Sequence, residues 1–296
     1  MKWVEALGYL INGISLGSVY AIIALGYTMV YGIAKMLNFA HGDVIMVGGY
    51  ISFCVTQYLG WPVPVSIAAA IFVCTVLGMV IERFAYKPLR NAPKLAVLIT
   101  AIGMSYLLQN SAQLIWSANP KSFSSVVTVG SVHLFDGKLT ITGEAIVTVL
   151  CCIVIMIALT LFTQHTKIGK AMRAVSEDQG AAQLMGVDVN FTISVTFAIG
   201  SALAAVAGVL LCSSYPVLMP TTGSMPGIKA FTAAVFGGIG SIPGAMLGGI
   251  LLGIIEILSS AYISTELANA IVFFVLIIML LVKPSGLLGK VTREKV

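Results

Sequence analysis

Three polar side chains, Asn38, His41 and Asp43, interrupt a stretch of sequence that is otherwise strongly apolar. An ionisable group at membrane depth costs roughly 2.5 kcal/mol or more, so such groups usually line a cavity or a pathway. Two interpretations fit these residues. They could cap the start of a helix at the membrane surface, as Asn and Asp often do. Alternatively, they could take part in gating or in contact with another subunit.

A single carboxylate, Glu256, lies deep in an apolar run near the C-terminus. A carboxylate at that depth could serve a proton step, or it could form a hydrogen bond to a neighbouring helix. No Ser/His/Asp triad, paired carboxylates or metal-like cluster accompanies it, and His133 and His165 stand alone near loops. The Gly169-Lys170 pair is followed by Ala171 rather than Ser or Thr, so it does not complete a phosphate-binding loop. We therefore expect no enzymatic activity and no cofactor or metal in this chain.

Glycines recur from residue 237 onward, beginning with the run GGIGSIPG over residues 237–244. The spacing of Gly244 and Gly248 lets helix backbones approach closely. The Gly and Pro residues before them predict a broken or re-entrant helix, which is tolerated only where protein or water covers the backbone. We expect five glycines to act in helix packing: Gly237, Gly238, Gly240, Gly244 and Gly248.

A polar stretch over residues 169–186 is rich in helix formers and is long for a connector between two membrane spans. A short helix with small residues and a few charges suits insertion into a groove of a partner. An ordinary amphipathic surface helix is the alternative interpretation.

The elements that must position these residues are helices in lipid. The chain of 296 residues is 58% hydrophobic and 9% charged, with a mean hydropathy of +1.02, whereas soluble domains carry about 25% charged residues. The net charge of +5 does not indicate nucleic-acid binding, because the basic residues lie in short loops between apolar runs. The five cysteines lie in or beside apolar runs and are interpreted as small buried hydrophobes.

Roughly 20 apolar residues cross the hydrocarbon core as a helix. We therefore predict an all-α polytopic membrane protein with one domain over residues 1–296. It should have about eight transmembrane helices, a short re-entrant or broken helix around residues 228–236, and a cytoplasmic helix. Pro62 and Pro64 should divide the run 44–81 into two spans. The other expected spans are 8–33, 95–116, 144–163, 191–212, the Gly-rich run 227–259, which is too long for one crossing, and 267–282.

Basic residues concentrate in the stretches 83–94, 167–173 and 283–295, which should face the cytoplasm, as should the C-terminus. Segment 167–188 would then be cytoplasmic and loop 117–143 would lie outside. In that loop, apolar and polar residues alternate on both sides of Asp136-Gly137, which predicts a small hairpin.

Two motifs carry a resemblance to a known family: GYTMVYG (26–32) followed by NFAHG (38–42), and KAFTAAV (229–235) running into GGIGSIPGA (237–245). Together with the stretch 173–186, they resemble the branched-chain amino-acid ABC transporter permeases, specifically the Liv H-type subunit. The similarity extends over nearly the whole chain. It implies a permease in the bacterial inner membrane that carries leucine, isoleucine and valine.

The resemblance also implies partners: a second, related permease of the Liv M type, two cytoplasmic ATPase subunits that would bind ATP and Mg, and a periplasmic amino-acid-binding protein. The stretch 169–186 would dock on the ATPases, because its Ala181-Ala182-x-x-x-Gly186 core resembles the A-A-x-x-x-G element of such loops. Glu177 lies four residues before Ala181, which departs from the commonest spacing. The coupling residues implied are Arg173, Glu177, Asp178, Ala181, Ala182 and Gly186.

For the translocation pathway or its gate, the candidates are Asn38, His41, Asp43, Gln109, Lys229 and Glu256. Each could contact an amino acid in transit or bond to a neighbouring helix. The resemblance leaves open whether the cargo is a branched-chain amino acid, another small amino acid or an amide. It also leaves open whether this chain pairs with a different permease or with itself.

An ion- or proton-coupled secondary amino-acid transporter is the alternative function, because such carriers bury coupling carboxylates near the midplane. A passive channel is disfavoured, since no repeated ring of pore charges and no filter-like backbone motif is visible.

Overall fold

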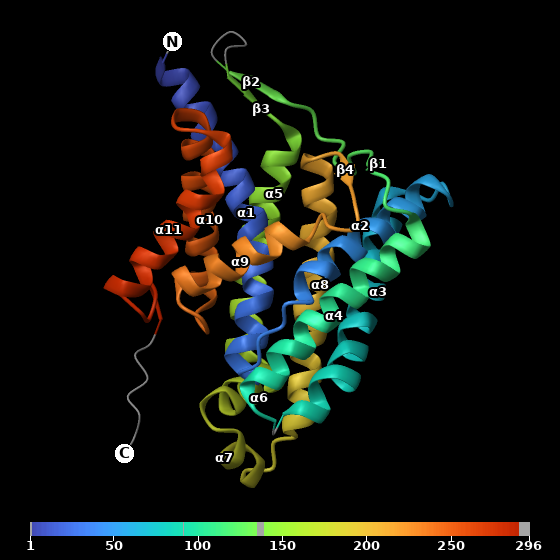
Figure 1. The fold of residues 1–296 in the computed structure, drawn as a ribbon, viewed down its shortest axis with the longest axis vertical. Coiled ribbons are helices and arrows are strands. Elements are labelled where there is room, and N and C mark those ends of the chain that lie inside the picture. Colours follow the sequence, from blue (N-terminus) through green and yellow to red (C-terminus); the bar gives the residue numbers. More distant parts are fainter. Residues whose placement is uncertain (1, 91, 135–138, 290–296) are drawn as a thin grey trace. The chain divides into compact units, whose positions relative to one another are not determined.

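A computed structural model describes residues 2–90, 92–134 and 139–289 of the chain, and nearly all of their regular structure is helical (Figure 1). The α-helices are α1 (Lys2–Ala34), α2 (His41–Gln57), α3 (Val63–Ile81), α4 (Lys94–Trp116), α5 (Gly143–His165), α6 (Lys167–Glu177), α7 (Gln179–Leu184), α8 (Val189–Ser214), α9 (Ser224–Gly237), α10 (Ile242–Tyr262) and α11 (Thr265–Val282). A π-helical turn, η1 (Glu82–Tyr86), and a 3₁₀ turn, η2 (Lys87–Leu89), follow α3. The strands are β1 (Lys121–Ser122), β2 (Val132–Leu134), β3 (Leu139–Ile141) and β4 (Val217–Leu218).

Seven helices of the described part are long and apolar enough to cross a membrane: α1, α3 with its η1 and η2 extension, α4, α5, α8, α10 and α11. These helices confirm the predicted all-α polytopic membrane protein. The predicted count of about eight is not confirmed, because α2, with 17 residues, is at the lower limit for a crossing. Helix α9 has 14 residues, too few to cross, as expected of a broken helix.

The contacts within the chain form two compact units, and α1, α5 and α9 each pass from one unit into the other. The first unit comprises residues 1–28, 129–156 and 229–296. In it α1 packs closely against α10: a Cβ added to Gly253 would lie 2.3 Å from the backbone N and Cα of Gly17. One at Gly249 would lie 2.5 Å from the backbone of Ala21. Small residues four apart thus let the two backbones approach each other.

The second unit comprises residues 29–128 and 157–228, and its centre is α2 packed against α3 and α8. Residues 41–50 of α2 are all buried. A Cβ at Gly48 would lie 2.7 Å from the Cα of Ala205, and one at Gly208 would lie 2.2 Å from the carbonyl oxygen of Ile45. Close contact of α2 with α8 therefore depends on small residues on both helices.

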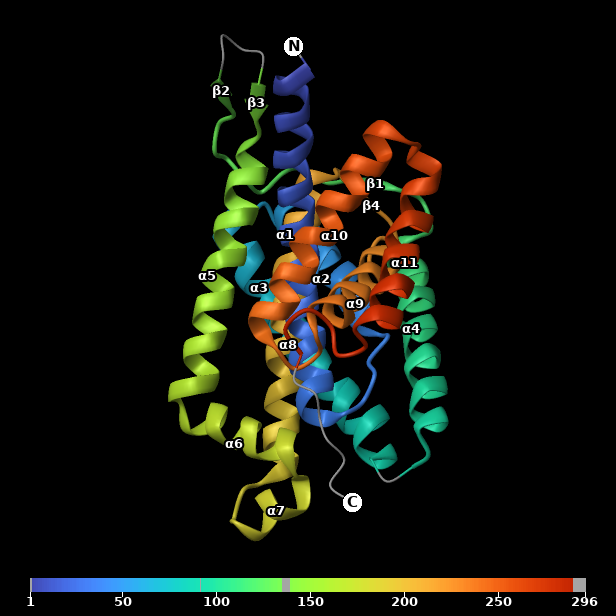
Figure 2. The same ribbon diagram turned by 90° about the vertical axis from the view of Figure 1, so that its left-hand side faces the viewer.

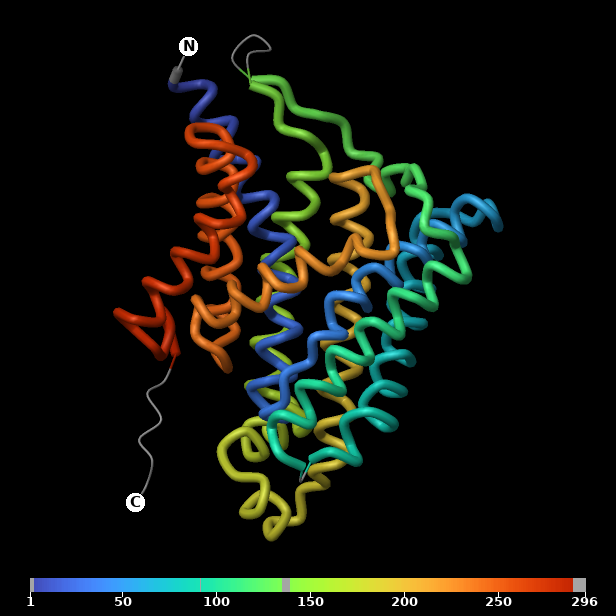
Figure 3. Tube along the Cα trace, in the orientation of Figure 1, coloured from blue at the N-terminus to red at the C-terminus, as the bar shows by residue number. Residues whose placement is uncertain are grey.

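The predicted division of the run 44–81 is confirmed. Helix α2 ends at Gln57 and α3 begins at Val63, with Pro62 in extended conformation at the N-cap of α3. Gly60, at φ +64°, adopts a left-handed conformation that favours glycine within the turn. Figure 3 shows the chain reversing between α2 and α3, in the blue part of the tube.

The predicted hairpin is also confirmed, since β2 pairs antiparallel with β3 and Val132 lies opposite Ile141. His133 and Thr140 face each other in this ladder, with Nδ1 and Oγ1 3.1 Å apart. The predicted turn residues Asp136 and Gly137 lie outside the described residues. Of the five cysteines, Cys74, Cys152 and Cys212 are buried and the other two are half-buried.

Candidate functional site

The polar residues 38–43 lie inside the helical bundle. Helix α2 begins at His41 with Ala40 as its N-cap, and no side chain caps it by a hydrogen bond. The side chains of Asn38, His41 and Asp43 are all buried. Asn38 Oδ1 accepts a hydrogen bond from the hydroxyl of Tyr86 at 2.9 Å. The capping interpretation is therefore wrong.

Asp43 is part of a hydrogen-bonded cluster centred on Gln109 of α4. The Gln109 Nε2 atom lies 2.8 Å from Oδ1 of Asp43. The same nitrogen lies 3.2 Å from the hydroxyls of Ser105 and Ser224, the latter being the first residue of α9. Next to it, a Cβ at Gly223 would lie 1.8 Å from the carbonyl oxygen of Gly42, so the start of α9 lies directly against the start of α2. The sequence singled out Asp43 and Gln109 but did not predict that they are partners.

A second cluster, around Glu82, was missed in the sequence. Glu82 is buried, forms an ion pair with Arg90 and accepts a hydrogen bond from Ser194 Oγ at 2.7 Å. Arg90 also donates to Asn190 at the start of α8. The sequence offered one sign of this cluster, namely Glu82 itself, an acid directly before the basic stretch 83–94. That stretch was used only to predict the topology.

The π-helical turn η1 connects these polar contacts. It carries Glu82 at its start and Tyr86 at its end, so one turn bonds to Arg90, to α8 and to Asn38 before α2. Single π-turns of this kind often occur at functional sites. The sequence of this turn is also compatible with a continued α-helix, so it does not predict the π-helical geometry.

Lys229 and Glu256 form an ion pair in the first unit, with Nζ 2.7 Å from Oε1. The hydroxyl of Tyr20 on α1 donates to the other carboxylate oxygen at 3.0 Å. The Lys229 ammonium also lies 5.8 Å from the centroid of the Tyr20 ring, within reach of a cation–π interaction. Glu256 therefore bonds to neighbouring helices, which was one of the two interpretations of this carboxylate.

The glycines after residue 236 divide into two groups. Gly237, Gly244 and Gly248 lie where helices approach closely: a Cβ at Gly237 would lie 2.0 Å from the carbonyl oxygen of Gly244, and one at Gly248 would lie 2.2 Å from that of Ala233. Gly240 has open space around it, so within the described residues it packs against no other helix. Its φ of +92° explains the glycine, because L side chains rarely adopt that conformation.

Gly238, at φ +101°, lies against the segment that follows α11 rather than against a helix. A Cβ there would lie 2.3 Å from the backbone N of Gly289. In this segment the amides of Leu287 and Leu288 each donate at 2.9 Å, to the carbonyl oxygens of Phe236 and Gly237. The end of α9 is thereby capped by backbone from the C-terminal part of the chain.

The stretch predicted as one helix over 169–186 is two helices, α6 and α7. Asp178, in extended conformation, separates them and caps α7 by accepting a hydrogen bond from the amide of Ala181 at 2.9 Å. Gly186, at φ +81°, follows the end of α7. Figure 2 shows α7 beyond the end of α8.

Most of the predicted coupling residues lie on the surface of this segment. Ala182 is buried, whereas the following are exposed: Arg173, Glu177, Asp178, Ala181 and Gly186. Sequence reasoning missed Leu184 and Met185, whose exposed fractions are 90% and 84%. Two adjacent apolar side chains, exposed between polar residues, form a surface that suits contact with a protein partner.

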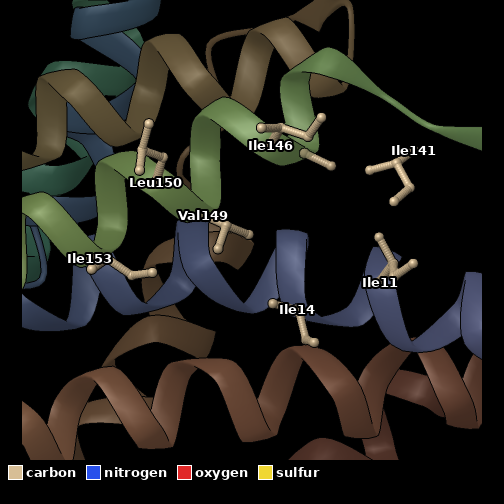
Figure 4. A pocket seen from close by; sticks show the side chains of 8 residues that line it. Ile11, Ile14, Ile141, Ile146, Val149, Leu150 and Ile153 are labelled. Atoms are coloured by element: carbon tan, nitrogen blue, oxygen red, sulfur yellow. The ribbon is translucent and has the colours of Figure 1, made fainter. Parts of the chain in front are cut away.

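A cavity of about 380 Å³ lies between α1 and α5 in the first unit, and Figure 4 shows its side chains. The lining residues are Ile11, Ile14, Ile141, Ala145, Ile146, Val149, Leu150 and Ile153. None of these side chains has a polar atom, so the cavity has no group to hold a charged ligand. Within the residues that the structure describes, no three His, Cys, Asp or Glu side chains gather to hold a metal ion.

Residues 9–280 match the family model described as the permease component of the branched-chain amino acid transport system. The chain is 47% identical to the high-affinity branched-chain amino acid transport system permease protein LivH of Escherichia coli K12, over 98% of this chain and 97% of that protein. It is 45% identical to the corresponding permease protein BraD of Pseudomonas aeruginosa, over 98% of both.

Among solved structures, PsaBC from Streptococcus pneumoniae in complex with Fab aligns with a TM-score of 0.50 and 14% identity, over 94% of this chain and 92% of that one. This likeness concerns the fold alone. The family match and the identity across nearly the full length, with seven helices able to cross a membrane, are decisive. The chain is a multi-pass membrane protein and belongs to the permease family of the branched-chain amino acid transport system.

Proposed function

We propose that this chain is the membrane-spanning subunit of an ATP-binding-cassette importer that carries branched-chain amino acids across the bacterial inner membrane. Separate ATPase subunits, which bind ATP and Mg, drive it, and a periplasmic binding protein supplies the cargo. A second permease of the Liv M type completes the membrane part. The C-terminus and the segment 167–188 face the cytoplasm.

The α6–α7 segment is the observation that carries this proposal. It joins two helices that are long enough to cross a membrane, α5 and α8, so it lies at one membrane face. It exposes charged and small residues together with Leu184 and Met185. A short helical element with an apolar tip suits insertion into a groove of a soluble partner. Closure of the ATPases would move this segment and shift the helices between two arrangements.

The buried polar clusters are the proposed pathway or gate. Asn38, His41, Asp43 and Gln109 lie in one unit, and Lys229 and Glu256 lie in the other. The alternative, a proton-coupled carrier, needs a carboxylate that is available to protons. Glu256 is instead paired with Lys229 and Tyr20, which favours the ATP-driven mechanism.

The decisive experiment combines purification of the complex from its native membrane with one substitution. We expect the ATPase subunits to co-purify with the wild-type chain. Met185→Glu should release them and lower ATP-driven uptake at least tenfold. A charge placed in a buried contact weakens the binding free energy between the subunits by about 1.4 kcal/mol or more. The side chain is exposed in the free chain, so membrane insertion should remain normal.

Met185→Leu is the matched control, since it keeps an apolar side chain at the tip and should retain the ATPase subunits. Absence of any ATPase from the wild-type preparation would contradict the proposal. If Met185→Glu retains the ATPases and transports normally, the α6–α7 tip is not the docking site.

A further inference from the structure

The triad of Lys229, Glu256 and Tyr20 places a full positive and a full negative charge together inside the first unit. The ammonium and carboxylate are 2.7 Å apart, and their side chains are 8% and 15% exposed. The carboxylate has the greater access to the surroundings, and its second oxygen is held by the Tyr20 hydroxyl at 3.0 Å. The three side chains come from three helices: α9, α10 and α1.

The triad lies near the middle of the helices that can cross the membrane. Leu252 is the middle residue of α10, and Glu256 follows it by about one turn. Tyr20 lies two residues from the middle of α1. Lys229 is carried by α9, which is too short to cross and is broken from α10 at residues 238–241. Transporters commonly place substrate sites near the midplane, on discontinuous helices of this kind.

Helix packing does not account for the charges. Helix α10 already contacts α1 through Gly253 and Gly17, and it contacts α9 through Gly248 and the backbone of Ala233. A buried ion pair is weak evidence for stability, because desolvation offsets much of the attraction and apolar replacements are often tolerated. Ionisable residues at membrane depth instead mark substrate or ion pathways.

We infer that Lys229 and Glu256 form a binding site for the zwitterion of an α-amino acid, with the pair opening to exchange partners during passage. The substrate carboxylate replaces Glu256 as the partner of the Lys229 ammonium. The substrate ammonium replaces Lys229 as the partner of the Glu256 carboxylate, which the Tyr20 hydroxyl holds in place. A neutral pair and a neutral zwitterion give a neutral complex, so no uncompensated charge is created at depth. This inference rests on the proposed function.

Other sites in the described residues match this chemistry less well. The cavity between α1 and α5 has only aliphatic lining. Asp43 takes hydrogen bonds from the side chains of Gln109 and Ser105, which are both neutral. The remaining ion pair in the described residues, Glu82 with Arg90, lies beyond the end of α3 rather than near the middle of a span.

The test uses the complete transporter, with its ATPases and binding protein, in liposomes. ATP-driven uptake of radiolabelled L-leucine and ATP hydrolysis are measured for the double variant Lys229→Met with Glu256→Gln, which leaves no unpaired charge. We expect assembly and hydrolysis to persist while uptake falls about 10- to 100-fold, as expected for the loss of a hydrogen bond to a charged group. Tyr20→Phe, which keeps both charges, should cause a smaller loss. Uptake by the double variant within about threefold of wild type would overturn the inference, because a purely structural pair tolerates neutral replacement.

The charge-exchanged variant Lys229→Glu with Glu256→Lys covers the case in which the neutral variant does not assemble. It keeps an ion pair but reverses the positions of the charges relative to Tyr20. Assembly with lost uptake supports the zwitterion site, and normal uptake overturns it. Failure of both double variants to assemble also overturns it, because the pair would then be structural. Failure of the proposed function is distinguishable, since wild-type uptake would then not depend on ATP.

Discussion

The hydroxyl of Tyr86 shows how single polar atoms hold this bundle together. Tyr86 is 1% exposed, and its ring packs at a tilted angle on Phe197, with centroids 5.2 Å apart. Its hydroxyl donates to Asn38 at 2.9 Å and thereby fixes the segment that leads into α2. An unsatisfied buried acceptor costs about 1–3 kcal/mol. Removing one partner of this hydrogen bond therefore costs more free energy of unfolding than the net contribution of the intact bond.

We expect Tyr86→Phe to lower the stability of the purified chain by about 1–2 kcal/mol, because Asn38 would lose its donor. The shift is measured as a lower Tm in detergent. Tyr58→Phe is the matched control, since Tyr58 is 67% exposed and keeps its ring contact with Phe53. Equal Tm values for both variants would contradict the role of this hydrogen bond.

At the residue scale, the sequence predicted which polar residues are candidates for the site, but it did not predict which of them bond to one another. Lys229, Glu256, Asp43 and Gln109 stood out because polar groups are costly in lipid. Their pairing joins positions 27 and 66 residues apart, and no local period encodes such contacts. Glu82 was not predicted as a site residue, because it lies beside a basic stretch, where charged residues usually indicate the orientation of the spans in the membrane.

At the scale of helices, close packing of α1 on α10 depends on glycines, because a Cβ added at these positions would overlap the backbone of the neighbouring helix. The contact joins Gly17 to Gly253 and Ala21 to Gly249. Gly13, Gly17 and Ala21 have the same four-residue spacing as the glycines of α10. That spacing was visible in the sequence of α1 but was missed, because the glycines of α1 are sparser than those of the run from residue 237 onward.

We expect Gly253→Ala to destabilise the first unit by about 1–3 kcal/mol, because the added methyl group would overpack against the Gly17 backbone. Thermal unfolding in detergent measures the effect. Gly103→Ala in α4 is the control, since open space surrounds that position and alanine favours helix. A stability of Gly253→Ala equal to that of the control would show that the helices separate at low cost.

Element boundaries were predicted where the sequence has strong local signals. Pro62 and Pro64 correctly predicted the division between α2 and α3, because proline fixes the backbone and starts helices. The division between α6 and α7 was missed, although Asp178 is a typical N-cap residue. The π-helical turn at Glu82–Tyr86 could not be predicted, since its sequence is also compatible with an α-helix.

At the scale of the whole chain, α5 connects two elements that each carry exposed side chains. The β2–β3 hairpin precedes it and α6–α7 follow it, and α5 is long and apolar enough to cross a membrane. The hairpin and the α6–α7 segment should therefore lie on opposite sides of the membrane. The basic residues of segment 167–173 predict which side is cytoplasmic.

Cysteine labelling tests this topology. In a background without the five native cysteines, Val132→Cys should react with a membrane-impermeant maleimide in intact spheroplasts, because Val132 is 43% exposed on the hairpin. Leu184→Cys, at a position 90% exposed, should react only after lysis. The opposite pattern, or equal labelling of both positions in intact spheroplasts, would contradict the proposed orientation.

The backbone cap on α9 also has a consequence for biosynthesis. The amides that complete the end of α9 come from Leu287 and Leu288, about fifty residues later in the chain and after α11. Chains emerge from the ribosome N-terminus first, at about 5–20 residues per second. The end of α9 therefore stays uncapped until the segment after α11 has been synthesised. A polypeptide that stops directly after α11 would lack both amides and would leave the carbonyl groups of Phe236 and Gly237 without these donors.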